Sequence, residues 1–219
     1  MSEASWTAVD DYVSDHLLKP DTALVEALAH NAANKLPPID VSPTQGKMLM
    51  LLVQMAGAKQ ILEIGTLGGY STIWLARALP ADGKLVTLEV DRKHARVAAE
   101  NLERAGLADK VDIKVGPAKD SLAAMPVGDP FDFVFIDADK QSNIHYVEEA
   151  IRLGTTGTSI IVDNVVREGA IVDPANDDPR VVGTRKLFDY VSAHPRLEAT
   201  AIQTVGCKGW DGFLLARVV

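Results

Sequence analysis

Residues 60–71 read QILEIGTLGGYS, a short apolar run followed by a loop with three glycines. The run over residues 60–65 has the length and apolar character of a buried strand, and a helical pattern begins at Tyr70. A strand, a glycine-rich loop and a helix in this order are typical of an open α/β sheet, in which ligands bind beyond the carboxyl ends of the strands. The sequence therefore predicts a sheet of this kind, with a ligand site at the loop.

Four more apolar runs follow and alternate with helical patterns. The runs cover residues 84–90, 111–115, 131–136 and 159–162, and the helical patterns cover 70–79, 92–105, 118–125 and 143–153. This alternation predicts a parallel sheet with helices on both faces. The tail differs, because a helix over about 179–193 is followed by two β-like stretches, 197–204 and 212–219, with no helix between them. We therefore expect an α/β fold with a mostly parallel, seven-stranded sheet that ends in an antiparallel C-terminal hairpin.

The start of the chain, residues 1–40, has helical patterns and is expected to form an N-terminal helical extension. Pro37 and Pro38 end these patterns, and Ser42-Pro43 supplies a cap residue and an N-terminal proline for the next helix. Because 219 residues suit one domain, residues 1–219 are expected to form a single unit.

Composition excludes several classes of protein. The 22 Lys and Arg residues against 30 Asp and Glu residues give a formal net charge of −8, which opposes a nucleic-acid partner because such proteins carry basic surfaces. No run reaches the roughly 18 apolar residues of a membrane span, and the acidic N-terminal segment lacks the features of a signal peptide. We therefore expect a cytoplasmic protein with no nucleic-acid or membrane partner.

Metal chemistry in this chain would have to use oxygen ligands. The single cysteine, Cys207, excludes an intramolecular disulfide, and with five scattered histidines it opposes a zinc site. Asp137 follows the fourth predicted strand, and Asp163 and Asn164 follow the fifth. If these strands are neighbours, their carboxyl ends bring two carboxylates and an amide oxygen together as a site for a hard cation. The alternative is that these residues are ordinary loop acids and a helix cap.

Lys140 lies three residues after Asp137. A nearby cation disfavours the charged form of an amine, so this lysine is a candidate general base. A solvated surface lysine is the alternative.

Two carboxylates flank the predicted ligand loop, residues 65–69. Glu89 ends the second predicted strand, where a carboxylate can accept hydrogen bonds from a ribose diol, and Asp91 is the competing candidate. This arrangement fits NAD and S-adenosylmethionine equally. Glu63, just before the loop, favours a ligand with positive charge, such as the sulfonium and ammonium of S-adenosylmethionine. The glycine order also departs from the Gly-x-Gly-x-x-Gly of nicotinamide-dependent enzymes.

Together these motifs resemble the small, cation-dependent S-adenosylmethionine O-methyltransferases, the group of the caffeoyl-coenzyme A and catechol O-methyltransferases and their bacterial relatives. The resemblance extends from Ser42 to Phe213, and its specific parts are EIGT at 63–66 with YS at 70–71, FIDADK at 135–140 and VDN at 162–164. It implies a Rossmann-like class I methyltransferase fold. It also implies transfer of a methyl group from S-adenosylmethionine to a hydroxyl of a catechol-like or other small phenolic acceptor. Mg²⁺ is the first expectation for the cation, with Mn²⁺ and Ca²⁺ as alternatives, and a homodimer is expected.

The same resemblance assigns roles to individual residues. It places the cofactor against Val41, Glu63, Gly65, Ser71, Glu89, Ala118, Asp137 and Tyr146. It assigns the cation to Asp137, Asp163 and Asn164, the general base to Lys140 and the substrate side to Asp211. Trp210 is expected to form a wall on which the substrate stacks, and a packed surface aromatic is the alternative.

Two features depart from the family's pattern. The family's short Gly-Asp-Gly turn is expanded here to GCKGWDG at residues 206–212. The loop over 167–180, which helps to bind coenzyme A in the plant enzymes, carries four acids close to Arg180, so we expect a smaller acceptor. A nicotinamide-dependent oxidoreductase and a methyltransferase with a non-phenolic acceptor are the alternative functions.

Overall fold

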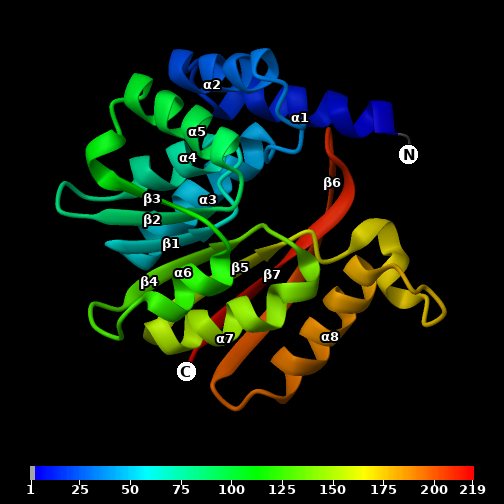
Figure 1. The fold of residues 1–219 in the computed structure, drawn as a ribbon. Coiled ribbons are helices and arrows are strands. Elements are labelled where there is room, and N and C mark those ends of the chain that lie inside the picture. Colours follow the sequence, from blue (N-terminus) through cyan, green and yellow to red (C-terminus); the bar gives the residue numbers. More distant parts are fainter. Residues whose placement is uncertain (1–2) are drawn as a thin grey trace.

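A seven-stranded sheet runs through the middle of the computed structural model (Figure 1). The structure describes residues 3–219, so the first two residues of the expected extension lie outside the described part. The strands are β1 (Gln60–Ile64), β2 (Lys84–Glu89), β3 (Val111–Val115), β4 (Phe131–Ile136), β5 (Gly154–Asp163), β6 (Leu197–Gly206) and β7 (Gly209–Val218). Their order in the sheet is β3-β2-β1-β4-β5-β7-β6. Strands β1 to β5 pair in parallel, whereas β7 is antiparallel to both β5 and β6, which confirms the predicted sheet.

Helices cover both faces of this sheet (Figure 1). They are α1 (Glu3–Leu17), α2 (Thr22–Ala33), α3 (Pro43–Ala56), α4 (Tyr70–Ala78), α5 (Arg92–Arg104), α6 (Ala118–Ala124), α7 (Asn143–Leu153) and α8 (Pro179–Ala193). Three short 3₁₀ helices lie in the loops: η1 (Ala108–Lys110), η2 (Lys140–Ser142) and η3 (Arg167–Val172). Helices α2 to α5 pack on one face, and α6 to α8 pack on the other.

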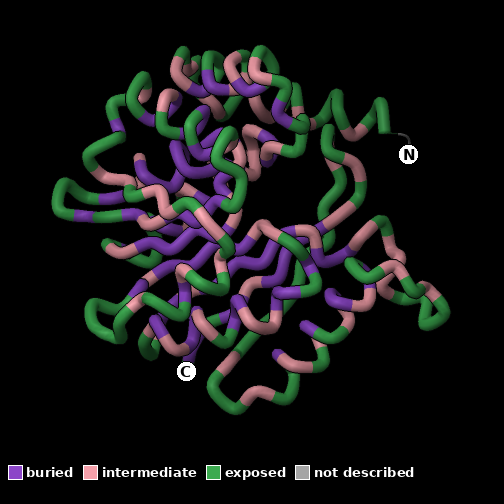
Figure 2. The backbone as a smooth tube through the Cα atoms, viewed as in Figure 1, coloured by how far each residue is buried: buried purple, intermediate pink, exposed green. Residues whose placement is uncertain are grey.

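The two faces of the sheet carry separate hydrophobic cores, and burial is deepest in the central strands β1, β2 and β4, whereas the edge strands β3 and β6 have no buried residue (Figure 2). In β4, Phe133 and Phe135 belong to the core under α2 to α5, whereas Val134 and Ile136 belong to the core under α6 to α8. Alternate side chains of a strand point to opposite faces, so a strand covered on both sides reads as a continuous apolar run. This is why the apolar runs of the sequence locate the central strands so closely.

Helix α3 begins and ends where its sequence indicates. The Ser42 hydroxyl accepts a hydrogen bond from the Gln45 amide, and Pro43 occupies the first turn, as expected from the Ser-Pro pair. Gly57 ends the helix in the left-handed conformation, with φ +62°. The N-terminus of α3 lies at the carboxyl end of β5, where Gln45 contacts Asp163.

The C-terminal hairpin differs from the sequence prediction at its turn. Gly206 pairs with Gly209, so Cys207 and Lys208 alone form the connection. The expected seven-residue turn is therefore wrong, because Trp210 and Asp211 already belong to β7. The sequence does not reveal the strands here, because glycines at 206, 209 and 212 interrupt the alternation of apolar and polar side chains that marks a strand.

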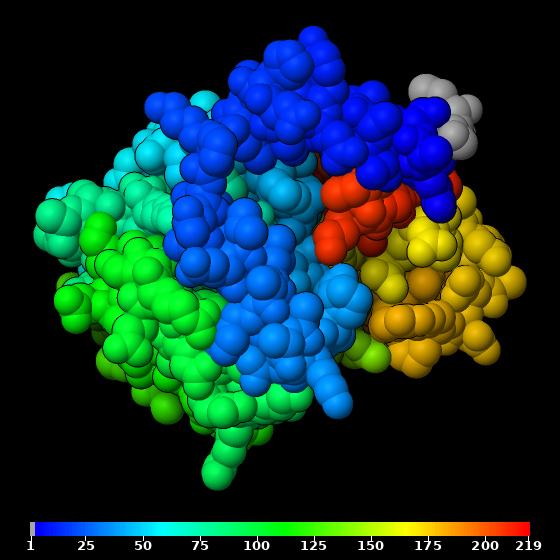
Figure 3. Space-filling view, turned by 90° about the horizontal axis from the view of Figure 1, so that it is seen from above, coloured from blue at the N-terminus to red at the C-terminus, as the bar shows by residue number. Residues whose placement is uncertain are grey.

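The tip of this hairpin contacts the N-terminal extension. The amide of Cys207 donates to Oδ2 of Asp10 on α1 at 2.7 Å, and Lys208 Nζ donates to the carbonyl of Pro38 at 3.3 Å. Figure 3 shows the red hairpin lying against the blue N-terminal helix on one face of the molecule. The first and last parts of the described chain thus meet beside the site described below. Within residues 3–219, no helix is both long and apolar enough to cross a membrane.

Candidate active site

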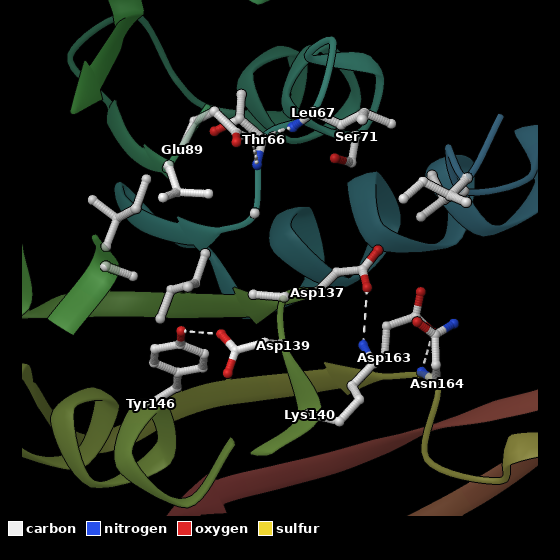
Figure 4. A pocket seen from close by; sticks show the side chains of 18 of the residues that line it. Thr66, Leu67, Ser71, Glu89, Asp137, Asp139, Lys140, Tyr146, Asp163 and Asn164 are labelled. Atoms are coloured by element: carbon white, nitrogen blue, oxygen red, sulfur yellow. Dashed lines mark hydrogen bonds and ion pairs between the residues drawn. The ribbon is translucent and has the colours of Figure 1, made fainter. Parts of the chain in front are cut away.

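A cavity of about 1090 Å³ opens at the carboxyl ends of the parallel strands. Its walls come from the loops after β1, β2, β4 and β5, from segment 38–41 and from the start of α4. Figure 4 shows the labelled side chains of two of these walls facing each other. This is the place where an open α/β sheet binds its ligand, as the sequence predicts.

The glycine loop passes against the loop after β4 with no room for side chains. Gly65 has φ +99°, and a Cβ atom at this position would fall on the carbonyl oxygen of Asp137. Glycine is the residue that accepts both the positive φ and the close approach. Gly65 therefore lines the cavity with its backbone, as expected.

Glu89 fixes the other side of the loop. Its Oε2 accepts hydrogen bonds from the amides of Thr66 at 3.2 Å and Leu67 at 2.8 Å, and its Oε1 accepts from the Asp91 amide at 2.9 Å (Figure 4). The carboxylate is buried yet lines the cavity, and Oε1 retains a lone pair for a ligand hydroxyl. The Asp91 side chain instead accepts from the amides of Lys93 and His94 as the N-cap of α5. Of the two candidates, Glu89 is therefore the one whose side chain binds the glycine loop and lines the cavity.

Glu63 lies behind the cavity wall. Its side chain is fully buried and accepts hydrogen bonds from the hydroxyls of Ser71 at 2.6 Å, Thr72 at 2.5 Å and Thr87 at 2.7 Å. Burial raises the pKa of the Glu63 carboxyl to about 7, although these three hydroxyls lower it and the Asp137 charge raises it further. Ser71 lines the cavity, so Glu63 faces the cavity through Ser71.

Three more of the predicted cofactor residues also line the cavity: Val41, Ala118 and Tyr146. The Tyr146 hydroxyl donates a hydrogen bond of 2.6 Å to Oδ1 of Asp139 (Figure 4). Burial, together with this carboxylate, raises the pKa of the Tyr146 phenol above its ordinary value. Ala118 begins α6, close in sequence to Pro117 and Lys119, which line the same wall.

An acidic cluster forms where β4 and β5 end side by side. Asp137, Asp163 and Asn164 all line the cavity, and Lys140 Nζ donates to Oδ1 of Asp137 at 3.1 Å (Figure 4). Burial, and then the charge of Asp137, raise the pKa of Asp163, while Lys140 lowers it. The structure therefore brings together the residues that the sequence assigned to a cation and to a general base.

Sequence reasoning missed Gln45, which completes this cluster. Its Nε2 donates to Oδ2 of Asp163 at 2.8 Å, while Oδ1 accepts from the Asn164 amide at 2.9 Å. Gln45 belongs to the first turn of α3, and no local pattern marks it, because its partner lies 118 positions away.

The donor set of this cluster fits a hard cation. Two carboxylates face one lysine ammonium, so positive charge is in deficit, and all the ligating atoms on offer are oxygens. In the described chain, residues 3–219, no three His, Cys, Asp or Glu side chains gather closely enough to hold a metal ion by themselves. A cation at this cluster would have to take a third protein donor from outside these residue types, such as the amide oxygen of Asn164.

Asp211 and Trp210 are placed differently from each other. Asp211 lines the cavity, but its Oδ1 accepts from the amides of Val166 and Arg167 at 2.9 and 3.0 Å, and its Oδ2 lies 3.6 Å from Arg167 Nη1. Trp210 is not among the lining residues; its indole packs against Gly169 and donates to Gln203 Oε1 at 3.2 Å. Asp211 holds the loop that follows β5. The contacts of Trp210 are those of a packed surface aromatic, the alternative given for it above.

This fold and this site define a class I methyltransferase: a doubly wound sheet, a glycine loop after β1, an acid at the end of β2 and acids after β4. A family model described as O-methyltransferase matches residues 14–219, so the chain belongs to the O-methyltransferase family. This confirms the family inferred from the sequence motifs and leaves the nicotinamide-dependent alternative without support.

Individual relatives agree with this assignment. The chain is 53% identical over 210 residues to a catechol O-methyltransferase of Mycobacterium tuberculosis, covering 96% of this chain and 94% of the relative. It is 47% identical over 220 residues to a catechol O-methyltransferase of Niastella koreensis, covering 100% of both. A crystal structure of the O-methyltransferase from Bacillus cereus in complex with SAH (S-adenosylhomocysteine) superposes with a TM-score of 0.98 at 56% identity, over 100% of both chains.

Proposed function

We propose that this S-adenosylmethionine-dependent O-methyltransferase transfers a methyl group to one hydroxyl of a catechol-type acceptor, with the help of a divalent cation. The observation that carries the proposal is the cluster of Asp137, Lys140, Asp163 and Asn164, which lines the same cavity as the glycine loop. The names of the Mycobacterium and Niastella relatives support a catechol as the acceptor.

The methyl donor fits the part of the cavity between the glycine loop and α6. Glu89 offers a carboxylate oxygen to ribose hydroxyls, and Ala118 and Tyr146 form an apolar wall for an adenine ring. Ser71 donates its proton to Glu63, so its oxygen presents lone pairs to the cavity. A hydroxyl oriented in this way suits the α-ammonium of the donor.

The cation fits the oxygen donors of Asp137, Asp163 and Asn164. When bound, it would supply Lewis-acid chemistry, which lowers the pKa of an acceptor hydroxyl and orients it. We propose Mg²⁺, with Mn²⁺ and Ca²⁺ as the alternatives that a metal titration separates.

Lys140 is proposed as the general base for the acceptor hydroxyl. It comes from η2, directly after the loop of Asp137, and only 6% of its surface is exposed. Its ammonium donates to Asp137, so it is held at the cation cluster. A cation held by the same carboxylates would disfavour the charged form of this amine, and the neutral amine could then receive the proton of the acceptor hydroxyl.

The acceptor is proposed to be small. Arg180 forms a bidentate pair with the side chain of Asp178, in which Nε donates to Oδ1 and Nη2 to Oδ2, and Arg185 donates to the carbonyls of Asp173 and Asn176. Arg180, which lines the cavity, is paired at the start of α8, and Arg185 ties α8 to the loop before it, so neither presents an unpaired guanidinium group to the phosphates of a large thioester.

The test is a methyl-transfer assay with catechol, a monophenol and an aliphatic diol as acceptors, each with Mg²⁺ and with excess chelator. We expect turnover of catechol alone, and we expect this turnover to be lost in excess chelator and in the Asp163→Ala variant. The wild type in chelator and the variant should both still bind S-adenosylhomocysteine. Equal turnover in chelator would contradict the cation, and turnover of the monophenol or of the aliphatic diol would contradict the acceptor class. A homodimer and a cytoplasmic location stay predictions, of which sedimentation tests the first.

A further inference from the structure

A buried asparagine of the N-terminal extension lies between two walls of the cavity. Asn31, on α2, is only 2% exposed. Its Nδ2 donates a hydrogen bond of 2.9 Å to Oδ1 of Asp40, and its Oδ1 accepts one of 3.0 Å from Nδ2 of Asn101. A polar side chain buried this deeply is stable only when its hydrogen bonds are made, so its partners show what it holds.

Both partners lead directly to the cavity. Asp40 lines it as part of segment 38–41, and the second Nδ2 hydrogen of Asn101 is donated to the carbonyl of Gly68 at 2.8 Å. Gly68 follows Thr66 and Leu67, which line the opposite side. Asn31, together with the amide group of Asn101, therefore joins segment 38–41 to the glycine loop.

The Asn31 side chain also packs directly against the backbone of the glycine loop. A Cβ atom added at Gly68 would fall on the Oδ1 atom of Asn31, far inside van der Waals contact. The glycine loop thus rests on the asparagine without an intervening side chain. The absence of a side chain at Gly68 is explained by this contact, since its φ is not in the left-handed region.

The orientation of the network is set from outside. Oδ1 of Asn101 accepts from Arg104 Nη1 at 2.6 Å and lies 3.0 Å from His30 Nδ1. A guanidinium group can only donate, so the amide oxygen of Asn101 must face Arg104 and its nitrogen must face Asn31. Asn31 then has to accept with its oxygen, which turns its nitrogen toward the Asp40 carboxylate.

We propose that Asn31 is a positioning residue for the methyl-donor site: it holds segment 38–41 against the glycine loop and so sets the affinity for the donor. The inference rests on the proposed function, because the cavity between these two walls is where we place S-adenosylmethionine. Asn31 does not line the cavity and acts through its bond to Asp40, its bond to Asn101 and its packing against Gly68.

An exchange of partners tests this role. Asn31→Asp places a carboxylate opposite Asp40, which removes the hydrogen bond and adds repulsion. Asn31→Asp combined with Asp40→Asn restores the network, because the carboxylate introduced by the first substitution can accept from both Asn101 and the amide introduced by the second. Asp40→Asn alone keeps a bond, since its amide oxygen can accept from Asn31, and it serves as the reference for the double variant.

The readouts are the dissociation constant of S-adenosylhomocysteine, by calorimetry at pH 8, and the KM for S-adenosylmethionine beside kcat. We expect Asn31→Asp to weaken binding by about ten- to a hundredfold with kcat changed less than about threefold. The double variant should return to within about threefold of Asp40→Asn. Asn34→Asp is the matched control, because this side chain donates to the His30 carbonyl of its own helix and should leave binding unchanged.

Several outcomes would overturn the inference. Unchanged binding in Asn31→Asp, or a double variant no tighter than Asn31→Asp, contradicts it. If Asn31→Asp does not fold, Asp40→Ala against Asp40→Asn makes the same comparison, and equal affinities of these two contradict it. A wild-type chain that binds no S-adenosylhomocysteine contradicts the proposed function itself, whereas normal wild-type binding with unaffected variants contradicts only the role of Asn31.

Discussion

Gln45 donates a hydrogen bond of 2.8 Å from Nε2 to Oδ2 of Asp163, although the two residues lie 118 positions apart. The other oxygen of this carboxylate accepts from the amide of Asn164. Both oxygens of Asp163 are thus oriented before any ligand arrives, and the first turn of α3 becomes part of the proposed cation site.

Gln45→Ala should raise the Mg²⁺ concentration needed for half-maximal turnover by about ten- to a hundredfold, because hydrogen bonds to a metal ligand fix its orientation. The measurement is a Mg²⁺ titration of the initial rate. Gln54→Ala, at an exposed position of the same helix, is the control. Overlapping titration curves for the wild type and Gln45→Ala would refute this role.

Lys140→Met should lower kcat by about a hundredfold or more, with the largest loss at low pH, where the acceptor hydroxyl is protonated and a base is most needed. Binding of S-adenosylhomocysteine should persist. The measurement is kcat against pH between about 6 and 10, with Lys186→Met, an exposed lysine of α8, as the control. A uniform loss at every pH would assign Lys140 to positioning of Asp137 and not to proton transfer.

Glu63 should make the free energy of unfolding fall as pH rises. Burial raises the pKa of Glu63 from 4.5 to about 7 in the folded chain, so the folded state binds more protons than the unfolded state between these values. Its stabilising contribution is fully present below about pH 4.5 and is lost as pH rises through about 7. The advantage of the wild type over Glu63→Gln should shrink by up to about 3 kcal/mol between these limits. Urea unfolding at about pH 5 and about pH 8 without cation measures it, and an equal difference at both pH values would exclude it.

Gly65→Ala should abolish binding of S-adenosylhomocysteine, because the added Cβ falls on the Asp137 carbonyl and drives the glycine loop away from β4. Gly57→Ala is the matched control: its φ is also positive, at +62°, but its Cβ meets nothing within 4 Å. The control should lose about 1 kcal/mol of stability and keep its affinity. Calorimetric titration compares the two, and equal affinities would show that the glycine loop accepts a side chain at position 65, which contradicts the prediction.

The sequence predicted the parts of the site that depend on strand ends. Because parallel strands end at one edge of the sheet, Glu89, Asp137 and Asp163 could be placed together from their positions after apolar runs. The strands themselves were recognisable because burial on both faces produces uninterrupted apolar stretches, as in β4.

The parts that escaped prediction depend on contacts distant in the chain. Neither the Gln45–Asp163 bond nor the Asn31–Asn101 bond leaves a local pattern, because Gln45, Asn31 and Asn101 each look like an ordinary polar residue of a helix. Glu63 was assigned to the cofactor side, yet its position behind Ser71 depends on hydroxyls from α4 and β2. The two-residue hairpin turn was concealed by glycines, which give no hydrophobic signal.

The tip of the β6–β7 hairpin is held by exposed hydrogen bonds to Asp10 and Pro38, so the residues that line the cavity are fixed in two different ways. The glycine loop and the acidic cluster come from the middle of the chain and are fixed by the sheet. Asp40 and Lys208 also line the cavity but lie outside the parallel strands; Asp40 is held by the buried Asn31, and Lys208 by an exposed hydrogen bond to the Pro38 carbonyl. Substitutions in segment 38–41 or at the hairpin tip can therefore reshape this part of the cavity wall without moving the acids at the strand ends.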